Sequence, residues 1–280
     1  MLSYAQAAVL GLLQGITELF PVSSLGHSVI LPALLGWHLD QASTSFVSFV
    51  VLTHLATALV LLGFFWQDWV HIVRGIVRSL RQRRVEGDTY SKLGWLIVVS
   101  TIPAGLLGLL FEKKLTTLFA APRLVAGALV LNGIVLYIAE QLRKKYGQLG
   151  TKDDGALTRL SWTQAIGIGF AQCFALIPGL SRTGLTMTGG LLSDLSHENA
   201  ARYAFMLATP IILAASVLEV PHIFTHGSLM VGQSLFGALC AAIAAYFSVR
   251  FLSKYFKSKT LIPFAVYCVI AGAISFFLLG

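Results

Sequence analysis

Long runs of hydrophobic residues separated by short polar stretches fill the chain from one end to the other. A helix that crosses a bilayer needs about 20 predominantly apolar residues, and six runs meet this requirement. They cover residues 45–66, 92–111, 123–142, 201–219, 230–252 and 261–280. The pattern predicts an all-α integral membrane protein with six transmembrane helices.

Two further apolar segments, residues 4–37 and 162–192, are interrupted near their middle. The interruptions read PVSSLGH at residues 21–27 and PGLSRTG at residues 178–184. Proline breaks the hydrogen-bond ladder of a helix, and glycine and serine favour turns. Each segment is therefore expected to be a broken helix.

The charged residues add an orientation to this picture. Only 11% of the 280 residues are charged, against about a quarter in soluble domains, and the net charge is +8. Lys and Arg cluster after Trp66, after Leu142 and from Arg250 onward, and these three regions are predicted to be cytoplasmic. Because the basic residues lie between helices, they indicate membrane orientation and no nucleic-acid partner.

The connections at residues 39–44, 112–123 and 220–229 carry few basic residues or none and are placed outside. With six spans between these assignments, segment 4–37 must begin and end outside, whereas segment 162–192 must begin and end inside. Both broken segments are therefore expected to be re-entrant hairpins. Backbone that is not helical at membrane depth is tolerated where it lines a polar cavity, so the hairpins are expected to meet at a site.

The two halves of the chain also resemble each other. Residues 3–14, SYAQAAVLGLLQ, align without gaps on residues 161–172, SWTQAIGIGFAQ, and Ser24 matches Ser181 after a shift of one residue. Each half has one hairpin and three spans, an odd number of crossings, so the repeats must be inverted. The sequence predicts one membrane domain made of two inverted repeats with a site near the midplane, covering residues 1–150 and 151–280.

Two charged residues stand out within the apolar segments. Glu18 is the only acidic residue well inside one, and Arg182 is the only basic residue at the second break. A charge at the centre of a membrane helix costs about 2.5 to 3.5 kcal/mol on insertion scales, so both residues are candidates for function. Opposite charges at one cavity suit an anionic ligand, with Arg182 as a planar fork for phosphate oxygens. The alternative is a structural ion pair.

The first break also carries hydroxyl, amide and imidazole groups. Gln14 lies four residues before Glu18, so their oxygens share a helix face and could bind one hard cation; the alternative is a packing contact. Ser23, Ser24 and His27 follow in one turn, where His27 could act as a base for Ser24 or attack phosphorus itself. The alternative is that the serines cap the second half-helix and that His27 is structural.

The second break resembles a phosphate-binding turn. A glycine-rich backbone that enters a helix presents free N–H groups to phosphate, and neighbouring hydroxyl groups add donors. His54, early in the first span, either borders the same site or makes a contact between helices. The candidate phosphate-binding residues of this turn are Gly179, Ser181, Arg182, Thr183 and Thr186.

The two motifs together, QGITELFPVSSLGH at residues 14–27 and PGLSRTGLT at residues 178–186, resemble the signatures of the undecaprenyl-diphosphate phosphatase family, the bacitracin-resistance proteins. The resemblance covers essentially the whole chain. It implies a multi-pass protein of the bacterial inner membrane whose active site faces the outer side. It also implies hydrolysis of undecaprenyl diphosphate to undecaprenyl phosphate, which recycles the lipid carrier for cell-wall synthesis and confers bacitracin resistance.

The same resemblance assigns roles to residues. It implies that Glu18 and His27 are catalytic, that Ser24 is the nucleophile or its neighbour, and that Arg182 clamps the diphosphate. A divalent cation, Mg²⁺ or Ca²⁺, is implied at Glu18 and Gln14. Substrate binding is implied for Gln14, Ser23, Gly179, Ser181, Arg182, Thr183 and Thr186.

This sequence departs from the family pattern at a few positions. Gln14 is the amide variant of a position that is often Glu, and Thr183 replaces the usual second Ser of its motif. The expected partners are the polyprenyl diphosphate and membrane lipids, and the sequence leaves open a homo-oligomer. The rival hypothesis is a polyprenyl-phosphate flippase or an ion-coupled transporter built on the same inverted repeat.

Overall fold

The structure is a computed structural model that describes residues 2–41, 43–85, 88–117, 121–146, 154–226 and 231–280. Every regular element within these ranges is a helix, so the predicted all-α class is confirmed. The helices are α1 (Tyr4–Thr17), α2 (Ser24–Leu34), α3 (Thr44–Phe64), α4 (Trp66–Gln82), α5 (Thr89–Thr117), α6 (Pro122–Tyr146), α7 (Trp162–Cys173), α8 (Arg182–Leu192), α9 (His197–His226), α10 (Val231–Tyr255) and α11 (Ile262–Leu278), with short 3₁₀ helices at Asp154–Arg159 and Phe174–Leu176.

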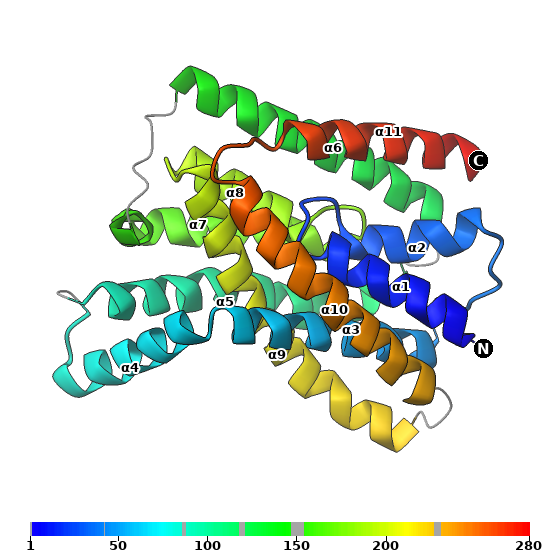
Figure 1. Ribbon diagram of the computed structural model, residues 1–280, viewed down its shortest axis with the longest axis horizontal. Helices are drawn as coiled ribbons and strands as arrows, with labels where there is room; N and C mark the ends of the chain where they lie inside the picture. The colour runs from blue at the N-terminus through cyan, green and yellow to red at the C-terminus, as the bar shows by residue number, and fades with distance from the viewer. Residues whose placement is uncertain (1, 42, 86–87, 118–120, 147–153, 227–230) are drawn as a thin grey trace.

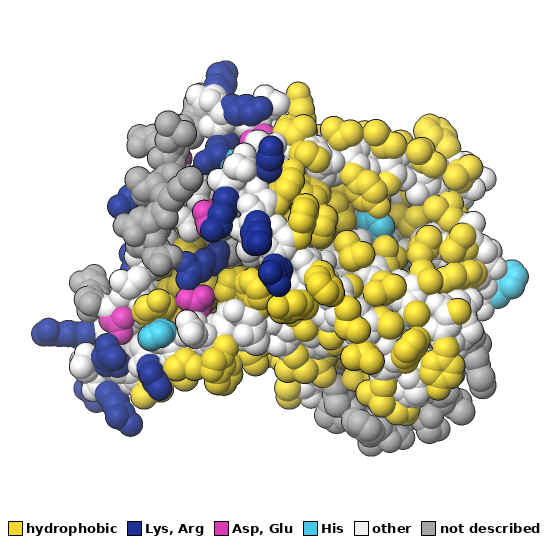
Figure 2. Space-filling model, viewed as in Figure 1, with side chains coloured by type: hydrophobic (Ala, Val, Ile, Leu, Met, Phe, Trp, Pro, Cys, Tyr) yellow, Lys and Arg dark blue, Asp and Glu magenta, His cyan; other side chains and the backbone are white. Residues whose placement is uncertain are grey.

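The six predicted spans correspond to α3, α5, α6, α9, α10 and α11. The first five are long and apolar enough to cross a membrane, whereas α11 is apolar but shorter. Large hydrophobic side chains such as Leu106, Phe247 and Phe277 remain exposed. Figure 2 shows a broad band of hydrophobic side chains on the face in view. An exposed apolar surface of this extent is what a lipid environment requires.

Both predicted breaks are confirmed. Helix α1 ends at Thr17 and α2 begins at Ser24, while α7 ends at Cys173 and α8 begins at Arg182. The outer halves of the two segments start in the same way. Ser3 and Ser161 each form a capping box, in which the serine and a glutamine three residues later bond each other's backbone N–H.

The inner halves also begin alike, but the two serines that match are not the predicted Ser24 and Ser181. Ser23 caps α2 by accepting a hydrogen bond from the N–H of Gly26, and Ser181 caps α8 by accepting one from Gly184. Ser181 therefore corresponds to Ser23 and not to Ser24, because the alignment of residues 3–14 on 161–172 continues through the break without a shift.

The two hairpins enter the helical bundle from opposite ends (Figure 1). Helices α1 and α2 start and finish at the end that holds both termini, whereas α7 starts at the other end. Figure 2 shows Lys and Arg side chains gathered at that second end, as expected for cytoplasmic connections. Some parts of the predicted connections and repeats lie outside the described residues: Lys152, residues 118–120 and 227–230, and the boundary between residues 150 and 151. The inverted repeat stays a prediction.

One predicted loop is wrong. The basic stretch after Trp66 is not an irregular connection but the 17-residue helix α4, which packs against α5. Ile72, Gly75 and Ser79 are buried on one face, at spacings of three and four residues, while Arg74, Arg78 and Arg81 are exposed. The arginines lower the hydropathy of the stretch and conceal a helical pattern that is amphipathic.

Small residues place the first hairpin close to its neighbour. Helix α1 packs on α10, and a Cβ atom on Gly11 would lie 2.2 Å from the carbonyl oxygen of Gly237. Close approach of backbones through small residues is a common way for helices to associate in membranes. The second hairpin is held by α5, α6 and α9.

Candidate active site

The two helix breaks meet in the interior of the protein. The hydroxyl of Thr183 donates to the carbonyl oxygen of Glu18 over 2.8 Å, and the N–H of Gly179 donates to the Ser23 hydroxyl over 3.1 Å. Each bond joins one hairpin to the other across more than 150 positions of sequence. The prediction that the hairpins meet is confirmed.

Asn132, on α6, bridges the same two breaks with one side chain. Its amide nitrogen donates to the carbonyl oxygen of Pro21 over 3.0 Å, and its amide oxygen accepts from the N–H of Ser181 over 2.9 Å. The residue is completely buried. Sequence reasoning missed Asn132, although an amide in the middle of an apolar span was an available signal.

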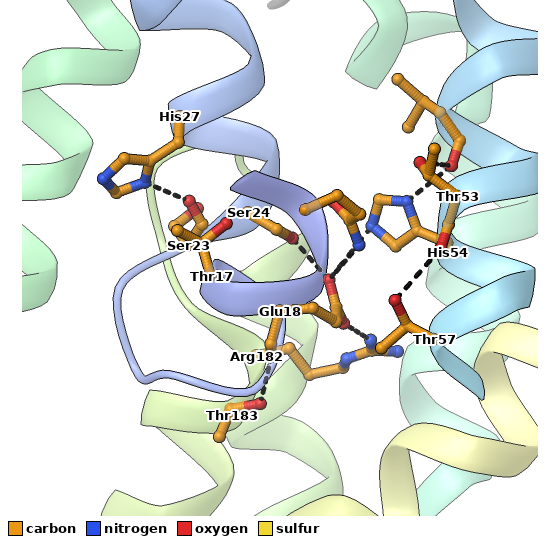
Figure 3. Close-up of polar contacts among 12 residues, drawn as sticks. Thr17, Glu18, Ser23, Ser24, His27, Thr53, His54, Thr57, Arg182 and Thr183 are labelled. Carbon is orange, nitrogen blue, oxygen red and sulfur yellow. Dashed lines mark hydrogen bonds and ion pairs between the residues drawn. The ribbon is translucent and has the colours of Figure 1, made fainter. Parts of the chain in front are cut away.

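Glu18 lies at the centre of a polar cluster (Figure 3). It is only 7% exposed. One carboxylate oxygen accepts hydrogen bonds from the Gln14 amide, at 3.1 Å, and from the Ser24 hydroxyl, at 2.5 Å. The other oxygen forms an ion pair with Arg182. The structure therefore brings together Gln14, Glu18, Ser24 and Arg182, as the sequence predicted.

His54 completes this cluster from α3. Its Nε2 atom lies 3.1 Å from the Glu18 oxygen that also receives the Ser24 hydroxyl. Its Nδ1 atom lies 2.8 Å from the carbonyl oxygen of Val50, which can only accept a hydrogen bond, so Nδ1 carries a proton. Of the two alternatives for His54, the structure favours the one at the polar site.

His27 does not join the cluster. Figure 3 shows its ring on the opposite side of α2 from Glu18 and Ser24. Its Nδ1 atom bonds the carbonyl oxygen of Ser23 at 2.7 Å, and its Nε2 atom bonds the Tyr267 hydroxyl at 2.8 Å. Both ring nitrogens thus have partners away from Ser24, which corrects the expectation that the two side chains face one another. The catalytic role of His27 stays a prediction.

Ser23 is held in an unusual backbone conformation. Its φ angle is +70°, in a region that residues other than glycine rarely adopt. Its hydroxyl accepts hydrogen bonds from the N–H groups of Gly26 and Gly179, at 3.2 Å and 3.1 Å. Strain of this kind persists where surrounding contacts fix it, and it often accompanies a functional turn. The hydrogen bond from Gly26 is the helix cap that was the alternative role for Ser23, and the structure shows it.

The second break supplies polar groups with unused hydrogen-bonding capacity. Within the described part of the chain, the Nε atom of Arg182 and the hydroxyl of Thr186 are buried without a partner. The two residues are four positions apart on α8 and so share a helix face. Buried polar groups are nearly always bonded, so partners supplied by a bound ligand would explain this pair.

The cluster has donors for a divalent cation, but only one carboxylate. Mg²⁺ and Ca²⁺ prefer oxygen ligands, which Glu18 and Ser24 present side by side, while the Gln14 amide faces Glu18 with its nitrogen and carries its oxygen on the same group. The guanidinium of Arg182 contacts the same carboxylate, and among the described residues no group of three or more His, Cys, Asp or Glu side chains could hold a metal. These residues fit a cation whose coordination is completed by phosphate oxygens.

A second buried carboxylate corrects the view that Glu18 stands alone. Glu140, on α6, is 1% exposed and pairs with the Nε2 atom of His197 at 2.9 Å. The Nδ1 atom of His197 accepts from Arg143 at 2.9 Å, and the N–H of Leu261 donates to Glu140 at 3.3 Å. The group joins α6, α9 and the start of α11. It is a structural junction, because each member already has a partner.

The fold and the cluster define a multi-pass α-helical membrane protein with a buried, phosphate-compatible polar site. The chain belongs to the bacitracin resistance protein BacA family, whose model matches residues 7–274. It is 45% identical to the undecaprenyl-diphosphatase of Mycolicibacterium paratuberculosis, over 98% of this chain and 96% of the relative. Undecaprenyl-diphosphatases of Mycobacterium avium and Acidiphilium cryptum are each 44% identical, over 98% of this chain and 96% and 97% of the relatives.

Proposed function

We propose that this protein hydrolyses undecaprenyl diphosphate to undecaprenyl phosphate and inorganic phosphate. The relatives named undecaprenyl-diphosphatase support the reaction over almost the full length of the chain. Within the molecule, the observation that carries it is the hydrogen bond from the Ser24 hydroxyl to the buried carboxylate of Glu18. The reaction returns the lipid carrier to cell-wall synthesis and gives resistance to bacitracin.

Ser24 is the proposed nucleophile. It is the first residue of α2, where free N–H groups and the helix dipole favour the negative charge of a phosphate. Its Oγ atom forms a bond to the terminal phosphorus while Glu18 accepts the hydroxyl proton. The bond from that phosphorus to the bridging oxygen breaks, and undecaprenyl phosphate leaves. Glu18 passes this proton to the departing undecaprenyl phosphate. Water then attacks the phosphoserine and gives a proton to Glu18, which returns it to the Ser24 oxygen as the bond from that oxygen to phosphorus breaks and phosphate is released.

Arg182 is the proposed diphosphate clamp. In the structure its guanidinium is paired with Glu18, which keeps both charges satisfied in the protein interior. A diphosphate offers the guanidinium a second partner, to which it can donate two parallel hydrogen bonds. The hydroxyl of Thr186 lies on the same face of α8 as Arg182. Transfer of the guanidinium to the substrate frees one Glu18 oxygen for proton transfer.

A divalent cation, Mg²⁺ or Ca²⁺, belongs to the proposal. Glu18 and Gln14 would hold it together with phosphate oxygens, and it would supply charge neutralisation on the diphosphate. The residues of the chain would then orient the reacting phosphorus and exclude bulk water from it.

We place the protein in the bacterial inner membrane with the site facing the outer side. The basic connections gather at the end opposite to the one where the first hairpin enters, and basic connections favour the cytoplasm (Figures 1 and 2). The hairpin that carries Ser24 then reaches the midplane from outside. Two inverted repeats account for the matching caps of the two hairpins.

The test is phosphate release from undecaprenyl diphosphate by the purified protein in detergent. Wild type should release phosphate, whereas Ser24→Ala and Glu18→Gln should lose at least about 1,000-fold in kcat, as expected for a nucleophile and its base. Ser48→Ala, which removes another buried serine hydroxyl, should keep wild-type activity. No phosphate release from well-folded wild type would overturn the proposal and favour the flippase or transporter.

The nucleophile can be identified separately. With substrate labelled at its terminal phosphorus, acid quenching should trap an acid-stable phosphoserine in wild type and none in Ser24→Ala. A phosphoryl group that is lost in acid but stable in base, and that disappears in His27→Ala, would assign the attack to His27. Turnover without any trapped label in either protein would favour water as the nucleophile.

A further inference from the structure

Helix α4 begins where a membrane span ends. Only Phe65 separates it from α3, and the guanidinium of Arg202, on α9, donates to the Asp68 carboxylate over 2.7 Å and ties the first turn of α4 to the bundle. Figure 1 shows α4 at the end of the molecule where Figure 2 shows Lys and Arg side chains gathered. The helix therefore starts at the edge of the hydrophobic band.

A stripe of large apolar side chains on α4 remains exposed. Its members recur at spacings of seven, four and three residues, which places them on one face of the helix. Each of them is between 42% and 61% exposed, and they are Trp66, Val73, Val77 and Leu80. The face that packs on α5 is a separate one, because its buried residues Ile72 and Ser79 each lie one position before a member of this apolar stripe, about 100° around the helix.

A stripe of exposed arginines borders the apolar stripe on its other side. Arg74, Arg78 and Arg81 each follow one position after a member of the apolar stripe. Arg78 pairs with Asp88 at 3.1 Å, whereas Arg74 and Arg81 form no ion pair with any residue that the structure describes. Between positions 66 and 84 there is one acidic residue against five arginines. This face of α4 therefore carries positive charge that a partner could neutralise.

The two adjoining stripes match the two parts of an anionic phospholipid. A helix that lies in a membrane interface buries an apolar face among the upper acyl chains and turns its basic face to anionic headgroups. A guanidinium fits a phosphate with two parallel hydrogen bonds, and tryptophan, as at position 66, favours the level of the headgroups. A second copy of this chain is a poor occupant, because the same face of the copy would present arginines to arginines.

We propose that α4 is an interfacial helix that binds anionic phospholipid. The acyl chains lie against the apolar stripe, and the headgroup phosphates accept hydrogen bonds from Arg74 and Arg81. This lipid site is separate from the Glu18 and Arg182 cluster and does not depend on the proposed hydrolysis. The bound lipid holds the hairpin of α4 and α5 at the membrane surface, where the pair of Asp68 and Arg202 connects it to α9.

Fluorescence quenching measures which lipid lies against α4. A coumarin-bearing amino acid replaces Val77, and the full-length protein is placed in phosphatidylcholine vesicles. One set of vesicles contains phosphatidylglycerol with a nitroxide on its acyl chain, and the other contains the same mole fraction of phosphatidylcholine with the same label. The control carries the coumarin at Leu239 of α10, a leucine that is 57% exposed on a membrane span.

At position 77 the labelled phosphatidylglycerol should associate at least about threefold more strongly than the labelled phosphatidylcholine, because arginines at the membrane surface attract anionic headgroups. At position 239 the two lipids should quench equally. Equal quenching at position 77, the same preference at both positions, or no quenching at position 77 by either lipid overturns the proposal. The last result would mean that water or another protein covers the apolar stripe.

Charge variants test the assignment to Arg74 and Arg81. The double variant Arg74→Gln with Arg81→Gln leaves the pair of Arg78 and Asp88 intact and should lower the preference at position 77 to about onefold. The matched control is Arg250→Gln with Lys254→Gln, which removes two exposed positive charges from α10 and should leave the preference unchanged. An undiminished preference in the first double variant, or an equal loss in both, would contradict a lipid site on α4.

Discussion

Replacement of Asn132 by leucine should both destabilise the protein and misalign the two helix breaks. Leucine has the same branched shape and the same number of heavy atoms but bonds neither the Pro21 carbonyl nor the Ser181 N–H, the two groups that Asn132 satisfies at 3.0 Å and 2.9 Å. A buried polar group that loses its partner costs about 1 to 3 kcal/mol, so the two together cost about 2 to 6 kcal/mol. The thiol of Cys268 also donates to the Pro21 carbonyl, over 3.9 Å, but a thiol is a weaker donor than the amide it would have to replace.

Thermal unfolding of the purified protein in detergent measures this cost. At about 2 °C per kcal/mol for a chain of this size, Tm should fall by on the order of 4 to 12 °C. Asn132 bonds Pro21, which lies shortly before Ser24, and Ser181, which directly precedes Arg182. Loss of these bonds should displace both reacting groups, so phosphate release below Tm should fall as well, with the loss in kcat exceeding the change in KM. The matched control is Asn199→Leu, because the amide nitrogen of Asn199 is buried without a partner within the described residues. If Asn132→Leu unfolds at the Tm of Asn199→Leu, the bridge does not stabilise the two breaks.

Three further outcomes follow from the same contacts. Gly179→Ala should lower Tm and activity strongly, because the φ angle of Gly179 is +102° and a Cβ atom there would lie 2.4 Å from the Val125 carbonyl oxygen. The control Gly167→Ala, at a position with open space around it, should match wild type in both assays. Arg182→Lys keeps the charge but loses the planar fork, so kcat/KM for undecaprenyl diphosphate should fall by about 10- to 100-fold, and full activity would refute the clamp. EDTA should abolish phosphate release, and added Mg²⁺ should restore it. Calorimetry without the lipid substrate should show only weak Mg²⁺ binding, because Glu18 is the lone carboxylate of the cluster. Micromolar Mg²⁺ binding would contradict a metal site that the substrate completes.

Hydropathy and proline positions were sufficient to predict most of the fold. A lipid-facing helix must be apolar along its whole length, so the six spans appear directly in the sequence, and both breaks coincide with Pro-Gly-Ser clusters. The same reasoning missed α4, because a helix outside the apolar band has one buried face only and is rich in arginine.

The composition of the site was predicted better than its geometry. A charge within an apolar segment is costly, so Glu18 and Arg182 could be identified without a structure. The direction of the His27 ring depends on a partner 240 positions away, the Tyr267 hydroxyl, and spacing along α2 carries no information about it. The contact between His54 and Glu18 also joins different helical segments, so spacing within one helix could not predict it either.

The two halves of the chain contribute different chemistry to one site, although their hairpins begin with matching caps. Gln14 and Gln172 occupy equivalent positions in the aligned segments, yet the Gln14 amide donates to the Glu18 carboxylate, whereas the Gln172 amide donates to the carbonyl oxygen of Ser100 over 2.5 Å. The first hairpin therefore supplies the acidic group and the hydroxyl, and the second supplies the guanidinium. A site shared in this way needs both hairpins in a fixed relation. The bonds from Thr183 to Glu18 and from Gly179 to Ser23 join the two breaks directly and so help to hold the reacting groups in that relation.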